Sequence, residues 1–124
     1  MRLTYRDISI LFTGDIYEAA EAELLAAFPR LRCSILKIPH HGSATSSSQP
    51  FLEKLRPSIA LLSVGSQNSF NLPHPAVIKR YEDVGCRILR TDEDGAVSVE
   101  TDGLSLGVRT HLPTNTINGS SAGR

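Results

Sequence analysis

Short apolar runs alternate with helical patterns along most of this 124-residue chain. Four runs are short, rich in β-branched residues and typical of strands: 8–13, 34–38, 59–64 and 87–91. Apolar residues recur at helical spacing over 16–28 and 75–84, and Pro50 favours a short helix through Leu55. Because strand–helix–strand units form right-handed crossovers, this order predicts an α/β domain with β-α-β-α-β-α-β units around a largely parallel sheet.

Two turn signals follow the fourth predicted strand. The segment 92–95 (Asp-Glu-Asp-Gly) predicts a hairpin turn that leads from this strand into a further strand at 96–100. The segment 101–103 (Thr-Asp-Gly) predicts a second turn before an apolar run at 104–108. We therefore expect a C-terminal antiparallel hairpin, a domain over 1–110, and a flexible tail over 111–124, where the residues are small and polar.

Composition excludes several classes of protein. Thirteen Lys and Arg residues balance thirteen Asp and Glu residues, which argues against a protein that binds nucleic acid through bulk positive charge. The apolar runs are far shorter than the roughly 20 residues that a membrane helix needs, and the first residues lack the apolar core of a secretory signal. Cys33 and Cys86 have no zinc-ribbon spacing, and both begin apolar runs, which favours buried thiols.

Polar residues with catalytic or metal-binding chemistry follow the predicted strands. Asp15 follows the first strand, the sequence His40-His41-Gly42-Ser43 follows the second, and His74 follows the third. Because ligands bind at the carboxyl ends of parallel strands, we expect these residues to lie along one edge of the sheet.

Each of these residues also has an ordinary structural interpretation. Asp15 has Glu18 three residues later, as in a helix capping box, although a capping carboxylate could still offer one oxygen to a metal ion. His40 and His41 would point in opposite directions on an extended backbone, so that one of them faces a site, or both could lie in a solvated loop. His74 is held between two prolines, either as a site residue or as an exposed histidine at a helix start.

The serine-rich run over 43–48 also has more than one interpretation. It is a flexible linker, a source of hydroxyl and N–H donors for an anion such as phosphate, or, at Ser48, a helix cap. Ser43, His41 and Asp15 could in principle form the triad of a Ser-His-Asp hydrolase. The serine is on no strained nucleophile turn, however, and the chain contains no Gly-x-Ser-x-Gly motif, which disfavours that chemistry.

Several motifs, taken together and in order, resemble those of a known family. They are Leu11-Phe12-Thr13-Gly14-Asp15, Leu36-Lys37-Ile38-Pro39-His40-His41-Gly42-Ser43, Ser46-Ser47-Ser48, the run 59–65, Asn68, Pro73-His74-Pro75 and Arg90-Thr91-Asp92-Glu93-Asp94-Gly95. The set is similar to the carboxyl-terminal half of the metallo-β-lactamase-fold domain at the end of ComEC/Rec2 competence proteins. The resemblance covers roughly residues 6 to 100 and implies part of an αββα fold.

The resemblance also implies roles for individual residues. Asp15 would be a metal ligand, and the histidine pair would supply another, with His41 favoured over His40. His74 would contact the substrate or the transition state, with Ser43 beside it. Many members of the family have a further histidine two residues before His74, where this chain has Leu72, so His74 has no paired histidine at that position.

The implied function is metal-assisted hydrolysis of DNA phosphodiesters during DNA uptake, with zinc or manganese as the divalent metal. The family's His-x-His-x-Asp-His cluster belongs to the amino-terminal half of the domain and does not occur in this chain. We therefore expect a partial domain that is inactive alone, with an uncovered apolar sheet face. Its partners would be the missing amino-terminal half, the membrane channel domain of the parent protein and, through that protein, DNA.

The parent protein would lie in the bacterial inner membrane, with this domain extracytoplasmic. Two alternatives differ in class from that function. One is a free-standing hydrolase of the same fold that acts on a small molecule, and the other is a metal-free remnant that binds DNA or a protein partner.

Overall fold

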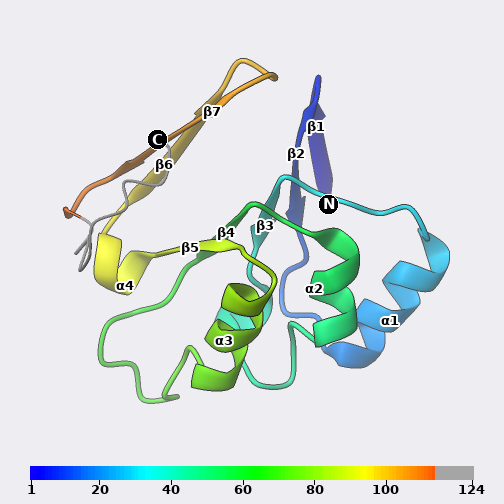
Figure 1. The fold of residues 1–124 in the computed structure, drawn as a ribbon. Coiled ribbons are helices and arrows are strands. Elements are labelled where there is room, and N and C mark those ends of the chain that lie inside the picture. The colour runs from blue at the N-terminus through cyan, green and yellow to red at the C-terminus, as the bar shows by residue number, and fades with distance from the viewer. Residues whose placement is uncertain (114–124) are drawn as a thin grey trace.

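A five-stranded sheet forms the centre of the structure, a computed structural model that describes residues 1–113 (Figure 1). Its strands, in spatial order, are β1 (Arg2–Tyr5), β2 (Ile8–Phe12), β3 (Ile35–Lys37), β4 (Ile59–Leu62) and β5 (Arg87–Arg90). The strands from β2 to β5 pair in parallel, and β1 pairs antiparallel with β2. The predicted α/β class and the largely parallel sheet are therefore confirmed.

The helices cover one face of this sheet. The longer ones are α1 (Glu18–Ala27), α2 (Gln49–Leu55) and α3 (Pro75–Asp83), and a single 3-10 turn, η1 (Pro39–Gly42), follows β3. Alternate residues of the central strands point toward the helices and form the larger core with buried residues of α2 and α3. The strand residues of this core include Leu11, Leu36, Ala60 and Leu62. The intervening residues point to the opposite face of the sheet.

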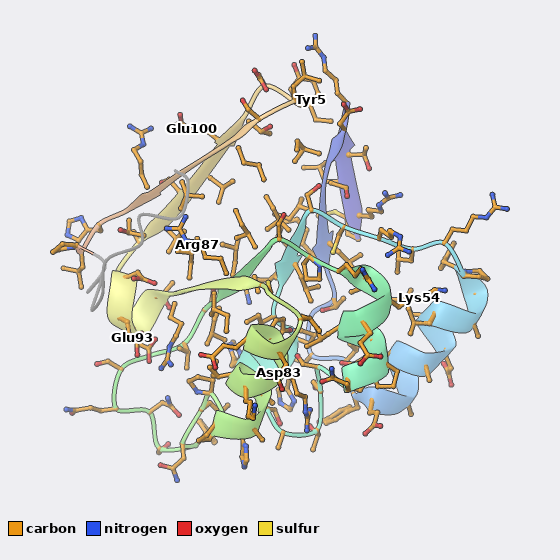
Figure 2. The ribbon with its side chains drawn as sticks, in the orientation of Figure 1. Tyr5, Lys54, Asp83, Arg87, Glu93 and Glu100 are labelled. Carbon is orange, nitrogen blue, oxygen red and sulfur yellow. The ribbon has the colours of Figure 1, made fainter. Side chains whose placement is uncertain are left out.

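A second layer covers that opposite face. Strands β6 (Val97–Thr101) and β7 (Leu106–Thr110) form a separate antiparallel hairpin, whose apolar residues pack against Ile35, Ile59 and Leu89. Side chains from both layers fill the space between them (Figure 2). At the hairpin tip, the Asp7 N–H donates to the Gly103 carbonyl oxygen at 2.9 Å, which ties β6–β7 to the β1–β2 turn. The expectation of an uncovered sheet face is wrong, because the chain folds its own hairpin over it.

The hairpin turn predicted at 92–95 is also wrong. Residues Thr91–Asp94 form a short helix, α4, and β6 pairs with β7 instead of returning along β5. The Asp94 carboxylate accepts the Arg90 backbone N–H at 2.8 Å, and the Asp92 carboxylate accepts two guanidinium bonds from Arg90 at 3.0 and 2.7 Å. These local bonds favour a helical turn, and the chain leaves it toward the second layer.

Strand β1 was not predicted from the sequence. It is an edge strand with one side of its backbone unpaired, and all four of its residues are exposed. At the other end of the chain, the His111 N–H donates to Ala96 and the Leu112 N–H donates to Asp94. The remainder of the predicted flexible tail, 114–124, lies outside the described residues, so its flexibility stays a prediction. No helix within residues 1–113 has the length and apolar character that spanning a membrane requires.

Both cysteines are buried in the helix-side core, as predicted. Burial raises the pKa of the Cys33 thiol from its ordinary value of 9.0 to about 12, and that of Cys86 likewise. Because the thiolate is the reactive form, a three-unit rise lowers its fraction near pH 8 by about 1000-fold.

We therefore expect neither thiol of the native protein to react with iodoacetamide at pH 8, and both to react in 6 M guanidinium chloride, as measured by intact mass. Fast labelling of the native chain would contradict the burial of this core.

Candidate functional site

Three loops come together at the carboxyl edge of the parallel strands. The loop after β2 carries Asp15, η1 after β3 carries the histidine pair, and the loop after β4 leads to His74. Two backbone hydrogen bonds join the loops: the His40 N–H donates to the Gly14 carbonyl at 3.1 Å, and the His74 N–H donates to the Gly42 carbonyl at 2.9 Å. The sequence-predicted residues therefore share one edge, as the β-α-β order requires.

The histidine pair has an unusual backbone. His40 has φ 49° and ψ 42°, and His41 has φ 53° and ψ 28°, so both lie in the left-handed region rather than in an extended segment. This backbone conformation costs a residue other than glycine about 1–2 kcal/mol of free energy. The premise that the two rings point to opposite sides of an extended strand is therefore wrong, and strain of this kind is typical of functional loops.

His41 has one ring nitrogen engaged and one free. Its Nδ1 lies 2.7 Å from the Ser63 carbonyl oxygen, and because a carbonyl only accepts, Nδ1 carries the proton. The lone pair of the neutral ring is then on Nε2, and the side chain is exposed. Metal-ligating histidines are commonly held in this way, with the second nitrogen donating to a backbone carbonyl.

His40 is in a different environment. Its ring lies edge-to-face with Tyr17, with centroids 5.3 Å apart and planes at 80°. Its Nδ1 is buried and has no hydrogen-bond partner among the described residues. His41 is therefore the histidine of the pair whose ring is oriented by a hydrogen bond and whose side chain is exposed.

His74 shows the opposite tautomer. It precedes α3 as the N-cap residue, and its Nδ1 accepts the Ala76 N–H at 3.1 Å. In the neutral ring the proton is then on Nε2, which makes the exposed nitrogen a hydrogen-bond donor. The two histidines thus offer complementary groups at one edge, a lone pair on His41 and an N–H on His74.

Asp15 is exposed and does not cap a helix. Helix α1 begins at Glu18, and its N-cap residue is Tyr17, without a side-chain cap bond, so the capping-box interpretation is wrong. The carboxylate is therefore not engaged by the helix start. Its charge acts on Lys37 at the end of β3: burial lowers the pKa of this half-buried amine, and Asp15 partly opposes that shift.

Lys37 lies at the end of β3, immediately before η1, and the sequence analysis named it only within the family motif. Its Nζ lies 3.5 Å from the Ile38 carbonyl oxygen, next to η1, and it belongs to none of the ion pairs of the described residues. The available signal was a lysine at the end of an otherwise apolar strand, immediately before the Pro-His-His turn.

Gly42 allows the close approach of these loops. Its φ is +79°, and a Cβ at this position would lie 2.6 Å from the Pro73 Cβ. Only glycine satisfies both the backbone conformation and the contact. The distance between η1 and the His74 loop therefore depends on this residue.

The serine-rich run is structural rather than a free anion site. The Ser47 and Ser48 N–H groups donate to the two carboxylate oxygens of Glu21, at 2.5 and 2.9 Å, and Glu21 is fully buried. The Ser46 hydroxyl donates to the Ile16 carbonyl at 2.6 Å, and the Ser47 hydroxyl bonds the buried Tyr81 hydroxyl at 2.8 Å. The predicted N–H donors do bind an anion, but it is a carboxylate of the chain itself.

Glu21 is a buried residue that the sequence analysis did not single out. It lies three, four and seven residues before Leu24, Leu25 and Phe28, which places it on the apolar side of α1. A carboxylate in that position is the signal for a buried partner.

Ser43 bonds to Thr45, with the two hydroxyl oxygens 2.9 Å apart. A serine nucleophile needs a hydrogen bond to a base, and no histidine is among the Ser43 side-chain contacts within residues 1–113. The geometry therefore gives no support to a Ser-His-Asp triad at this edge.

This edge offers some of the ligand types that a metal site requires, but not a complete set. The free Nε2 of His41, the Asp15 carboxylate and the orphaned Nδ1 of His40 are ligand types that zinc and manganese accept. No three His, Cys, Asp or Glu side chains in the described part of the chain converge closely enough to hold an ion. A complete zinc site requires more ligands than these loops bring together.

The chain is similar to proteins of known name. It is 34% identical over 90 residues to ComE operon protein 3 of Bacillus subtilis, a match that covers 73% of this chain and 12% of that protein. It is 36% identical over 98 residues to competence protein ComA of Neisseria gonorrhoeae (78% of this chain, 14% of that protein). It is 36% identical over 93 residues to recombination protein 2 of Haemophilus influenzae (73% and 11%).

No family model and no solved structure matches the chain. The aligned segment spans about an eighth of the length of the curated relatives. This chain is therefore homologous to a segment of competence proteins, which supports its place in a competence-protein family.

Proposed function

We propose that this chain contributes the carboxyl-terminal part of a metal-dependent phosphodiesterase domain that acts on DNA during competence. The observation that supports this most directly is His41, whose Nδ1–H donates to the Ser63 carbonyl and leaves Nε2 free. The turn that carries His41 is bonded to the Asp15 loop through the His40 N–H and the Gly14 carbonyl. The similarity to a protein named as a competence protein supports a role in competence, and the proposal takes DNA as the substrate in that role. The layer order of helices, sheet and second sheet is consistent with part of an αββα fold.

In this proposal, Asp15 and His41 hold a divalent metal, zinc or manganese, and His40 is a weaker candidate. When bound, such an ion polarises the phosphoryl oxygen and lowers the pKa of water at the site. The remaining ligands come from the amino-terminal half of the domain, with its His-x-His-x-Asp-His cluster. The longer protein would reside in the bacterial inner membrane, with this domain on the extracytoplasmic side beside the membrane channel.

The other edge residues act on the substrate. His74 donates its Nε2–H to a phosphate oxygen, where negative charge builds up in the transition state. The ammonium of Lys37 neutralises part of the phosphate charge near Asp15. Ser43, bonded to Thr45, supports the histidine turn through its N–H, which donates to the His40 carbonyl at 3.0 Å.

The test compares this chain with a joined protein, in which the stretch of ComE operon protein 3 that precedes the matched segment is fused to residues 1–124. We expect bis(p-nitrophenyl) phosphate hydrolysis near background for the chain alone, because one carboxylate and one imidazole leave most coordination positions to water. The joined protein should hydrolyse it, lose the activity in EDTA and regain it with Mn²⁺ or Zn²⁺.

The same assay separates the alternatives. Hydrolysis of neutral esters without phosphodiester hydrolysis would favour a small-molecule hydrolase. DNA binding that persists in EDTA without cleavage would favour a metal-free binding remnant. Cleavage by the 124 residues alone that is lost in a chelator would show that this chain supplies more metal ligands than the two proposed.

A further inference from the structure

Two exposed aromatic side chains lie on the same edge as the histidines. Tyr17, two residues after Asp15, is 55% exposed, and Phe70, four residues before His74, is 79% exposed. Because the strand order is β2-β3-β4, the histidine turn lies between the loops that carry them. Figure 1 shows the start of α1 and the loop between β4 and α3 at the lower end of the molecule.

The Tyr17 ring is held in place but open to solvent. It lies edge-to-face against His40, and such a contact covers at most one face of the tyrosine ring. The backbone beneath it is anchored, because the Glu18 N–H donates to the Thr45 carbonyl at 3.0 Å and the Glu21 N–H donates to the Tyr17 carbonyl at 3.0 Å. A ring ordered before binding loses little entropy when a ligand stacks on it.

The Phe70 ring is exposed on a loop with a defined backbone. The Asn68 side chain accepts the Phe70 and Leu72 N–H groups at 3.2 and 3.0 Å and donates to the Gly65 and Leu72 carbonyls at 3.0 and 2.7 Å. These bonds hold the loop in shape while leaving the phenylalanine in water. Folding gains nothing from an apolar ring in that position.

We infer that Tyr17 and Phe70 are stacking platforms for the bases of single-stranded DNA whose phosphate lies at the histidine edge, an inference that rests on the proposed function. A base within a duplex is covered on both faces by its neighbours, so only an unpaired base can stack on a side chain. Stacking is sequence-tolerant, because every base presents a π-face. Lys37, at the end of β3, and His74, on the loop that carries Phe70, supply the phosphate contacts at this edge. The edge therefore distinguishes single-stranded from double-stranded DNA and does not read the base sequence.

The experiment measures fluorescence anisotropy of a 5′-labelled 12-nucleotide oligothymidylate with the full 124-residue chain. Three competitors are compared: the same strand with abasic sites, which keeps the phosphates and removes the bases, a 12-base-pair duplex, and inorganic phosphate. The variants are Tyr17→Leu, which keeps apolar cover on His40 without a π-face, Tyr17→Phe, which keeps the ring, and Phe70→Leu. Tyr5→Leu is the control, since Tyr5 is 51% exposed and lies at the opposite end of the molecule, near the hairpin tip (Figure 2).

We expect Tyr17→Leu to raise the Kd for the oligothymidylate about 10-fold and Phe70→Leu to raise it about 5-fold, with Tyr17→Phe and Tyr5→Leu within about 2-fold of the parent chain. Thermal unfolding should be unchanged in all four, because the side chains are exposed. The abasic strand and the duplex should compete at least about 10-fold more weakly than the intact single strand.

Three results would overturn the inference. Equal binding of the abasic strand, with no effect of Tyr17→Leu, would remove the stacking role and leave the phosphodiester site standing. Equal binding of the duplex would remove the single-strand preference alone. Failure of every oligonucleotide to bind would overturn the stacking role and the DNA substrate together, and would favour a protein partner for the two rings.

Discussion

Replacing His41 by alanine in the joined protein is expected to reduce phosphodiester hydrolysis at least about 100-fold, with Asp15→Ala equally severe. The physical reason is that each variant removes a proposed metal ligand, whereas loss of a group that only orients a ligand already costs about 10- to 100-fold. His41 has its Nδ1–H fixed on the Ser63 carbonyl at 2.7 Å, and its side chain is exposed. The Nδ1 of His40, by contrast, is buried and has no hydrogen-bond partner among the described residues.

His40→Ala is the matched control, because it changes the neighbouring residue of the same turn. It removes the contact with the Tyr17 ring and a buried Nδ1 without a partner, and should cost less than 10-fold in rate. Metal affinity, measured by calorimetry with Zn²⁺, gives a readout independent of turnover. Retained activity and retained zinc binding in His41→Ala, together with their loss in His40→Ala, would reverse the ligand assignment.

Replacing Glu21 by alanine is expected to destabilise the chain by about 3–4 kcal/mol. The Glu21 carboxylate is fully buried and accepts the N–H groups of Ser47 and Ser48. Alanine leaves both donors without a protein partner, one of them on the fully buried Ser47, and each unsatisfied buried group costs about 1–3 kcal/mol. The measurement is urea unfolding followed by circular dichroism at 222 nm.

Glu23→Ala on the same helix is the control, since Glu23 is exposed and should change stability by no more than about 0.5 kcal/mol. Glu21→Gln should be intermediate, because the amide keeps one acceptor oxygen and turns a donor toward the other N–H. Equal stability of the Glu21 and Glu23 variants would mean that the serine-rich loop is not held by this carboxylate.

Much of the architecture could be predicted from local patterns alone. Short β-branched runs and helical spacing identified β2 to β5 and α1 to α3, because the period of apolar residues follows the geometry of each element. The parallel order then placed Asp15, the histidine pair and His74 at one edge. The edge strand β1 was missed because it is exposed on all four residues and carries no burial pattern.

Only the tertiary structure decided which hydrogen bonds each of these residues makes. The sequence by itself placed two histidines and an aspartate along an edge, but the tautomers of His41 and His74 depend on Ser63 and Ala76, the first of which is distant in the chain. Glu21 joins Ser47 and Ser48 across more than twenty residues, and the β6–β7 hairpin covers the sheet because α4 redirects the chain. Periodicity records which face of an element is buried, whereas hydrogen-bond partners and layer order are set by which segments meet in space.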